Sequence, residues 1–307
     1  MVAELNQLSK CRQAQASATA SAMRPGRLRL RNMTVLIVGG SGFLGAELVR
    51  QAAAGGRAVA ATYATRPGSS PVTWHALDLR DPDRADAVVA EAVPSVIINA
   101  TSGGADWEVT AEGPARLALA AARYGCRLVH VSSDAVFSGT RGGLYDEICY
   151  PDPVSPYGAA KAAAETSVRY LTPDAVIART SLIIGGIGSE HVRLVHDLVA
   201  GRRSGVLFTD DFRCPVHVGD LAAALLELAA SDERGVHHLG GAHAVSRHEL
   251  GLLIARRDGL DASRLVPGLR ADTALPGALD VRLDSRATQR KLRIPLRGAR
   301  DFLAART

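Results

Sequence analysis

The chain has 307 residues, 47% of them hydrophobic and 22% charged, so it can bury the core of one large domain or of two unequal ones. No apolar run approaches the roughly 18–20 residues that span a bilayer, so we expect no membrane-spanning segment. The four cysteines are scattered with no C-x-x-C pair, at Cys11, Cys126, Cys149 and Cys214. This argues against a metal site and a disulfide framework, and it predicts a reducing, cytoplasmic compartment.

The first 31 residues carry the whole formal net charge of +5, because they hold six basic side chains against Glu4. The remainder is neutral overall and has no electrostatic footprint for DNA or RNA, so we expect no nucleic-acid partner. The first 31 residues also lack the apolar stretch of a secretory signal. We interpret residues 1–32 as a disordered tail or a mis-called start, with a functional basic arm or a targeting segment as alternatives.

From Met33 onward, short β-branched apolar runs alternate with helical stretches rich in Ala and Leu. The predicted strands are 34–38, 57–62, 72–75, 95–99, 127–132 and 175–180. The predicted helices between them are 43–54, 83–92, 112–124 and 157–170. Continuous apolar strands separated by amphipathic helices predict an α/β fold with a Rossmann-type doubly wound parallel sheet over residues 33–181.

Beyond residue 182 this alternation breaks. Helices are predicted near 190–201 and 220–230, followed by an end rich in Leu and Arg with prolines at 267, 276 and 295. We expect residues 182–307 to form mainly a smaller, interleaved C-terminal substrate lobe, with segments about 205–240 returning to the Rossmann core.

A glycine-rich turn follows the first predicted strand and opens the first helix. Its glycines have the spacing G-x-x-G-x-x-G. Residues without a Cβ let a phosphate approach the backbone N–H groups at a helix N-terminus, and the last glycine lets helix and strand pack closely. The predicted cofactor-binding residues of the turn are Gly39, Ser41, Gly42, Phe43, Leu44 and Gly45.

The end of the second predicted strand lacks the acidic residue that binds the ribose 2′-hydroxyl in NAD sites. The sequence there runs from Ala61 to Arg66 without a carboxylate. A guanidinium can fork onto a 2′-phosphate, which a carboxylate would repel. Arg66 therefore favours NADP(H), with NAD(H) as the other possibility.

Tyr157 and Lys161 have the spacing Y-x-x-x-K at the start of a predicted helix, so they lie on one helix face. An ammonium nearby favours the phenolate and lowers the pKa of the tyrosine. Such a tyrosine can donate a proton to a carbonyl oxygen as hydride arrives. Ser133 and Asp134 end a strand, where side chains face the ligand crevice of such a sheet. Ser133 can therefore hydrogen-bond the same oxygen.

Together these residues resemble the extended short-chain dehydrogenase/reductase family, and within it the branch of nucleotide-sugar reductases similar to dTDP-4-dehydrorhamnose reductases. The resemblance runs from Met33 to about residue 250. The segments that carry it are 38–45, 97–101, 129–139, 145–147, 155–161 with Glu165, 179–181 and 213–222.

The resemblance implies roles residue by residue. Ser133, Tyr157 and Lys161 match the catalytic triad, and Tyr157 and Lys161 are also expected to touch the nicotinamide side of the cofactor. Two further pairs match cofactor contacts beside the adenine and the nicotinamide, respectively Asp78 with Leu79 and Ala100 with Thr101.

On the substrate side, the resemblance implies contacts from Ser133, Asp134 and Arg213. Arg213 matches an arginine that binds the diphosphate of a nucleotide sugar in many relatives, and the alternative is an ordinary apolar strand edge. This side also departs from the family pattern. Thr110 stands where relatives often have asparagine, and Ala135 and Leu182 each replace an aromatic residue. The segment between residues 99 and 110 is shorter and lacks an acidic, tyrosine-containing loop.

The sequence therefore predicts an NADP(H)-dependent reductase of a carbonyl group, most specifically the 4-keto group of a nucleotide-linked deoxysugar. Its partner is a small-molecule substrate, and a homodimer is possible. One alternative is an epimerase or dehydratase of the same fold, although Ala135 stands where dehydratases often have glutamate. The other is a non-catalytic dinucleotide-binding regulatory subunit, which the missing loop keeps open.

Overall fold

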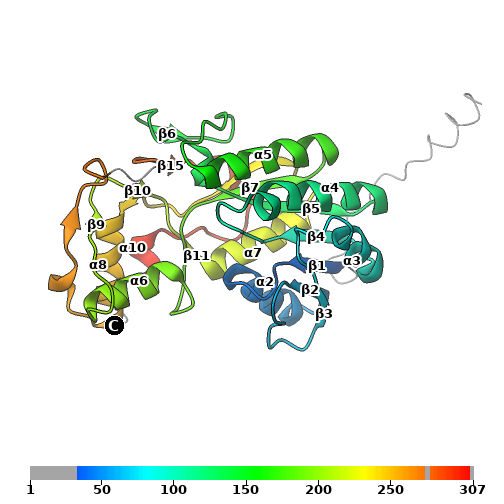
Figure 1. Cartoon of the computed structure of the whole chain (residues 1–307), viewed down its shortest axis with the longest axis horizontal. Coiled ribbons are helices and arrows are strands. Elements are labelled where there is room, and N and C mark those ends of the chain that lie inside the picture. The colour runs from blue at the N-terminus through cyan, green and yellow to red at the C-terminus, as the bar shows by residue number, and fades with distance from the viewer. Residues whose placement is uncertain (1–32, 274–276, 305–307) are drawn as a thin grey trace, which may run out of the picture.

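A computed structural model describes residues 33–273 and 277–304 of the chain. The expectations for residues 1–32 therefore lie outside the described residues. At the centre is a parallel sheet with the strand order β12-β7-β5-β4-β1-β2-β3 (Figure 1). Its strands are β1 (Thr34–Val38), β2 (Ala58–Tyr63), β3 (Thr73–Ala76), β4 (Val96–Asn99), β5 (Arg127–Ser133), β7 (Val176–Thr180) and β12 (Gly235–Leu239). The predicted doubly wound α/β sheet is confirmed.

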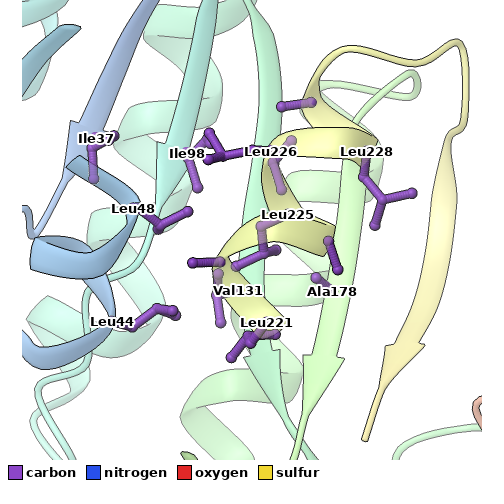
Figure 2. Packing of buried hydrophobic residues seen from close by; sticks show 14 of the residues in the cluster. Ile37, Leu44, Leu48, Ile98, Val131, Ala178, Leu221, Leu225, Leu226 and Leu228 are labelled. Atoms are coloured by element: carbon purple, nitrogen blue, oxygen red, sulfur yellow. The ribbon is translucent and has the colours of Figure 1, made fainter. Parts of the chain in front are cut away.

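The alternation of side chains along β1 shows how the two faces of the sheet are covered, because successive residues of a strand point to opposite faces. Val35 and Ile37 pack in the cluster that contains α2 and α7, whereas Leu36 and Val38 pack in the cluster that contains α3, α4 and α5. Figure 2 shows the first of these layers, where leucines of α2 and α7 meet over the sheet. These helices are α2 (Phe43–Ala54), α3 (Arg84–Ala92), α4 (Gly113–Tyr124), α5 (Pro156–Leu171) and α7 (Val218–Ala229).

The helix predicted at 112–124 has a π-helical turn before it, η2 (Glu108–Glu112). The side chain of Thr110 explains this geometry. Its Oγ1 accepts the Gly103 N–H at 3.2 Å and donates to the Gly104 carbonyl at 2.9 Å, which folds the short loop after β4 back onto the helix. Such π turns are frequent at functional sites.

A third apolar cluster belongs to the C-terminal part of the chain. It joins α6 (Glu190–Val199), α8 (Arg247–Asp258), η4 (Ala262–Arg264) and α10 (Ala299–Phe302). Helices α6, α8 and α10 gather at one end of the molecule, away from β1 to β4 (Figure 1). Among the described residues, no helix is long and apolar enough to cross a membrane.

Short two-stranded sheets accompany the main sheet, and each pairs segments that lie far apart in the sequence. The pairs are β6 (Leu144–Tyr145) with β15 (Arg282–Leu283), β8 (Ile183–Ile184) with β11 (Val216–His217), β9 (Leu207–Phe208) with β14 (Pro267–Gly268), and β10 (Phe212–Arg213) with β13 (Val245–Ser246). Among the remaining short elements, η3 (Asp134–Val136) follows β5 and α9 (Arg286–Gln289) follows β15.

Candidate active site

The glycine turn after β1 has the shape that a dinucleotide phosphate requires. Gly39 has a φ of +81°, and its N–H donates to Thr62 Oγ1 at 3.0 Å. A Cβ at Gly45 would stand 2.0 Å from the Gly39 carbonyl oxygen, so neither position accepts a side chain. Helix α2 then begins with Gly42 as N-cap, without a side-chain cap and without an acid in its first turn. Its first N–H groups therefore suit an anion, and the turn fits the predicted cofactor.

The other residues of this turn differ in what they can offer a cofactor. Leu44 is buried in the core, and Phe43 packs partly buried against the same cluster. Ser41 and Gly42 are exposed. Contacts from Leu44 would therefore have to come from its backbone, whereas Ser41 is free to use its hydroxyl.

The residues predicted to hold the adenosine end of the cofactor lie after β2 and β3. Arg66 is exposed in the loop after β2. Asp78 is paired with Arg80 at 3.1 Å, and Arg80 also binds Asp106 at 2.7 Å. Leu79 is buried in the core on the side of α3 and α4. Their cofactor roles stay predictions.

The loop after β4 is shaped by a buried asparagine. Asn99 Oδ1 accepts from the Thr101 N–H at 3.1 Å and from Thr101 Oγ1 at 2.6 Å. The Ala100 N–H donates to the Val38 carbonyl at 2.9 Å. These bonds turn the Thr101 carbonyl toward Lys161, whose Nζ lies 3.3 Å away. The predicted Ala100–Thr101 pair thus adjoins both the glycine turn and the lysine.

Helix α5 places Tyr157 and Lys161 beside the end of β5 and the loop after β4. The Ser155 hydroxyl caps the helix by accepting the Gly158 N–H at 3.1 Å, and Pro156 occupies its first position. A Cβ at Gly158 would stand 2.0 Å from the Ala135 carbonyl oxygen. The glycine between the tyrosine and the lysine therefore lets the helix approach η3, which directly follows Ser133.

Burial sets the protonation of both side chains. It raises the pKa of Tyr157, and the hydroxyls of Ser102 and Ser133 oppose that shift. It lowers the pKa of Lys161 to about 8, and the Lys161 ammonium donates to the Val131 carbonyl at 3.0 Å. The expectation that Lys161 lowers the pKa of Tyr157 is wrong for this structure, because burial dominates. The phenol is protonated near neutral pH, as a proton donor must be.

Ser133 and Asp134 connect β5 to η3 and the substrate side. Ser133 Oγ accepts the Ala135 N–H at 3.2 Å and lies 3.4 Å from Asp134 Oδ1. Asp134 is buried, and its Oδ2 accepts from Ser181 Oγ at 2.6 Å. Burial raises the pKa of Asp134, whereas Arg213, with Nε 3.7 Å from Oδ2, lowers it.

Arg213 belongs to a cluster of arginines around one buried carboxylate. Asp211 is fully buried and lies 2.7 Å from Arg213 Nη1, 3.4 Å from Arg247 Nε and 3.2 Å from Arg270 Nη1. The cluster adjoins Asp134, whose Oδ2 lies 3.7 Å from Arg213 Nε. Arg213 also donates to the carbonyls of three residues, namely Phe212, Ala278 and Leu279.

The structure thus brings the glycine turn, Thr101, Ser133, Tyr157 and Lys161 to the carboxyl ends of β1, β4 and β5. Sequence reasoning missed other residues of this neighbourhood: Asn99, Ser102, Asp211, Arg247 and Arg270. Among the described residues, no group of three or more His, Cys, Asp or Glu could hold a metal ion.

A doubly wound sheet whose carboxyl ends carry this glycine turn and this tyrosine–lysine pair defines an NAD(P)-dependent oxidoreductase of the short-chain dehydrogenase/reductase fold. The family described as RmlD substrate binding domain matches residues 33–305. The chain belongs to that family.

Individual relatives agree with this assignment. The chain is 33% identical over 253 residues to dTDP-4-dehydrorhamnose reductase of Mycobacterium tuberculosis, covering 77% of this chain and 79% of the relative. It is 29% identical over 261 residues to a probable low-salt glycan biosynthesis reductase, Agl14, of Haloferax volcanii, covering 80% and 87%. The crystal structure of a hypothetical dTDP-4-dehydrorhamnose reductase from Sulfolobus tokodaii matches with a TM-score of 0.75 and 27% identity, covering 86% and 97%.

Proposed function

We propose that the protein is an NADP(H)-dependent reductase of the 4-keto group of a nucleotide-linked deoxysugar. The observation that carries this proposal is the placement of Tyr157, whose hydroxyl neighbours those of Ser102 and Ser133, one helical turn before Lys161 and near the loop that adjoins the glycine turn. A proton donor placed there suits reduction of a carbonyl group. In this proposal residues 33–181 bind the cofactor and residues 182–307 mainly the substrate, with about 205–240 returning to the core.

The chemistry needs one hydride on the carbonyl carbon and one proton on its oxygen. A bound nicotinamide cofactor supplies the hydride. Tyr157 gives its proton to the oxygen, and the Ser133 hydroxyl orients that oxygen by a hydrogen bond. Lys161 stays charged between the carbonyls of Val131 and Thr101, from which it holds the nicotinamide ribose. A positioned acid of this kind contributes about 10²–10⁴ in rate.

Charge supports the nucleotide-linked substrate. The guanidiniums of Arg213, Arg247 and Arg270 gather around Asp211 beside Asp134, and guanidiniums are the groups that bind a diphosphate best. The relative from Mycobacterium tuberculosis is named for a nucleotide-linked 4-keto sugar. For the cofactor, Arg66 and the absence of an acid after β2 favour NADPH over NADH.

A substrate screen tests the proposal. NADPH oxidation is followed with nucleotide-linked 4-keto deoxysugars and, as matched controls, with the same sugars lacking the nucleotide. We expect net NADPH consumption with the former and little with the latter. Conversion of the sugar without net NADPH consumption would instead indicate an epimerase or dehydratase. Tight NADPH binding without any turnover would indicate a regulatory subunit.

A further inference from the structure

A buried ion pair lies one helical turn beyond Lys161. Glu165 of α5 and Arg179 of β7 are each 1% exposed, and Arg179 Nη2 lies 2.8 Å from Glu165 Oε2. Arg179 Nε reaches both carboxylate oxygens, at 3.0 and 3.2 Å. Its Nη1 donates to the Cys149 carbonyl at 3.1 Å. Removing two charges from water is costly, so a pair held this firmly invites a functional explanation.

The last two residues of β5, Ser132 and Ser133, have different partners: Ser132 contacts the Glu165–Arg179 ion pair, and Ser133 faces the candidate active site. Ser133 lies beside the Tyr157 hydroxyl. Ser132 is buried, and its Oγ donates to Glu165 Oε1 at 2.6 Å. Their partners differ because neighbouring side chains of a strand point to opposite faces of the sheet. The hydrogen bond therefore ties the carboxylate to the strand that also carries Ser133.

Lys161 and Glu165 are four residues apart on α5, which places them on one face of the helix. The hydrogen-bond acceptors of the Lys161 ammonium are the neutral carbonyls of Val131 and Thr101. The carboxylate of Glu165 supplies the negative charge that acts on this ammonium. Because both side chains are buried, water screens their interaction weakly.

We propose that Glu165 is a positioning residue of the active site: its carboxylate is the counter-ion that keeps Lys161 charged, and Arg179 and Ser132 hold that carboxylate in place. This inference rests on the proposed function, because it concerns the same lysine. It gives the buried pair a role in tuning Lys161, in addition to joining α5 to β5 and β7.

The direction of the effect follows from the charges. Burial lowers the pKa of Lys161 to about 8, and Glu165 raises it. Without the carboxylate, burial would act unopposed and the pKa of Lys161 would fall further. The ammonium would then lose its proton at a lower pH, together with its charge-assisted hydrogen bonds.

Other titratable groups around Lys161 leave this direction unchanged. Tyr157 lies on α5 and keeps its proton because burial raises its pKa. His130 on β5 is neutral, because burial and Lys161 hold its pKa well below the ordinary value. Asp134 on η3 is paired with Ser181 and Arg213, and Arg179 on β7 with Glu165. The charged groups of η2 and α4, which also pack against α5, lie on exposed or partly exposed surface: Glu108, Glu112, Arg116 and Arg123.

Three variants separate this role from a merely structural one. Glu165→Gln removes the counter-ion, Arg179→Gln removes its partner, and the double variant removes both. Each single variant leaves a buried charge unpaired and is expected to be less stable, whereas the double variant leaves none. Thermal melting identifies the folded variants. The pH dependence of NADPH affinity and of kcat/KM is then measured for each.

We expect Glu165→Gln to lose NADPH affinity and kcat/KM at a pH about one unit lower than the parent, and the double variant to shift in the same direction. A shift of one unit is roughly a fivefold loss at pH 8, where about half of the parent's Lys161 is charged. Arg179→Gln is expected to keep the parent profile or move it upward. A folded double variant with the parent profile would overturn the proposal, as would equal losses in all three variants at every pH. If the parent binds NADPH but reduces no keto sugar, the proposed function fails, and the NADPH-affinity profile still decides the role of Glu165.

Discussion

Replacing Tyr157 with phenylalanine isolates the proton donor. The change removes the phenol hydroxyl and keeps the ring, so packing around the start of α5 is preserved. Burial raises the pKa of Tyr157, so the parent enzyme has the proton in place throughout the neutral range. A positioned acid contributes about 10²–10⁴ in rate. We expect kcat to fall at least about 100-fold, which corresponds to about 2.7 kcal/mol of transition-state stabilisation.

The assay is single-turnover oxidation of NADPH with the best keto substrate, alongside a fluorescence titration of NADPH affinity. Tyr150→Phe is the matched control, because Tyr150 is 86% exposed and loses the same hydroxyl. The control should keep the parent rate, and both variants should bind NADPH as the parent does. If Tyr157→Phe retains more than about a tenth of the parent rate, another group donates the proton and the acid assignment is refuted.

Four further predictions concern the remaining parts of the site. Lys161→Met is expected to lower both kcat and NADPH affinity, measured by the same two assays, because its ammonium binds the Thr101 and Val131 carbonyls one helical turn from the proposed proton donor, Tyr157. Arg66→Ala is expected to abolish the preference for NADPH over NADH in parallel titrations, since one charge-assisted contact contributes about 1.5–3 kcal/mol. Arg247→Met is expected to raise KM for a nucleotide-linked substrate several-fold without changing NADPH affinity. Removal of residues 1–32 is expected to leave the melting temperature and NADPH affinity unchanged, as differential scanning fluorimetry and titration would show.

The sheet could be predicted from the sequence because its signal is local. Each strand from β1 to β7 in the main sheet lies within a residue or two of its predicted bounds, and β-branched residues mark most of them, although β3 has only Thr73. The π-helical start before α4 could not be predicted, because it depends on Thr110 bonding backbone groups of the loop after β4. A hydrogen bond from a side chain to a neighbouring loop does not change the spacing of apolar residues, so the sequence pattern does not reveal it.

The residues proposed for catalysis could be predicted from the sequence, whereas the arginine cluster around Asp211 could not. Ser133 ends a strand and Tyr157 and Lys161 begin a helix, so sheet topology alone places them at one crevice. The pKa of Tyr157 was predicted in the wrong direction, because the spacing of the pair says nothing about how deeply either side chain is buried. Asp211 and its arginines meet only through the pairing of β10 with β13 and a loop near residue 270. Because the chain is rich in arginine, the sequence alone gives no reason to distinguish Arg247 or Arg270 from ordinary surface arginines.

The contacts of Arg213 also decide which arginine is suited to an anionic substrate. Its guanidinium donates to three backbone carbonyls and is paired with Asp211, and its side chain is only 10% exposed. A diphosphate that recruited Arg213 would take the donor from the Ala278 carbonyl, at about 1–3 kcal/mol if that group were left unsatisfied, whereas the carbonyls of Phe212 and Leu279 also accept backbone N–H groups. The Arg247 side chain is 25% exposed and the Arg270 side chain 16%. We therefore expect Arg213 to hold Asp134 and the 278–279 segment, and Arg247 to be the first of these arginines to contact an anionic substrate.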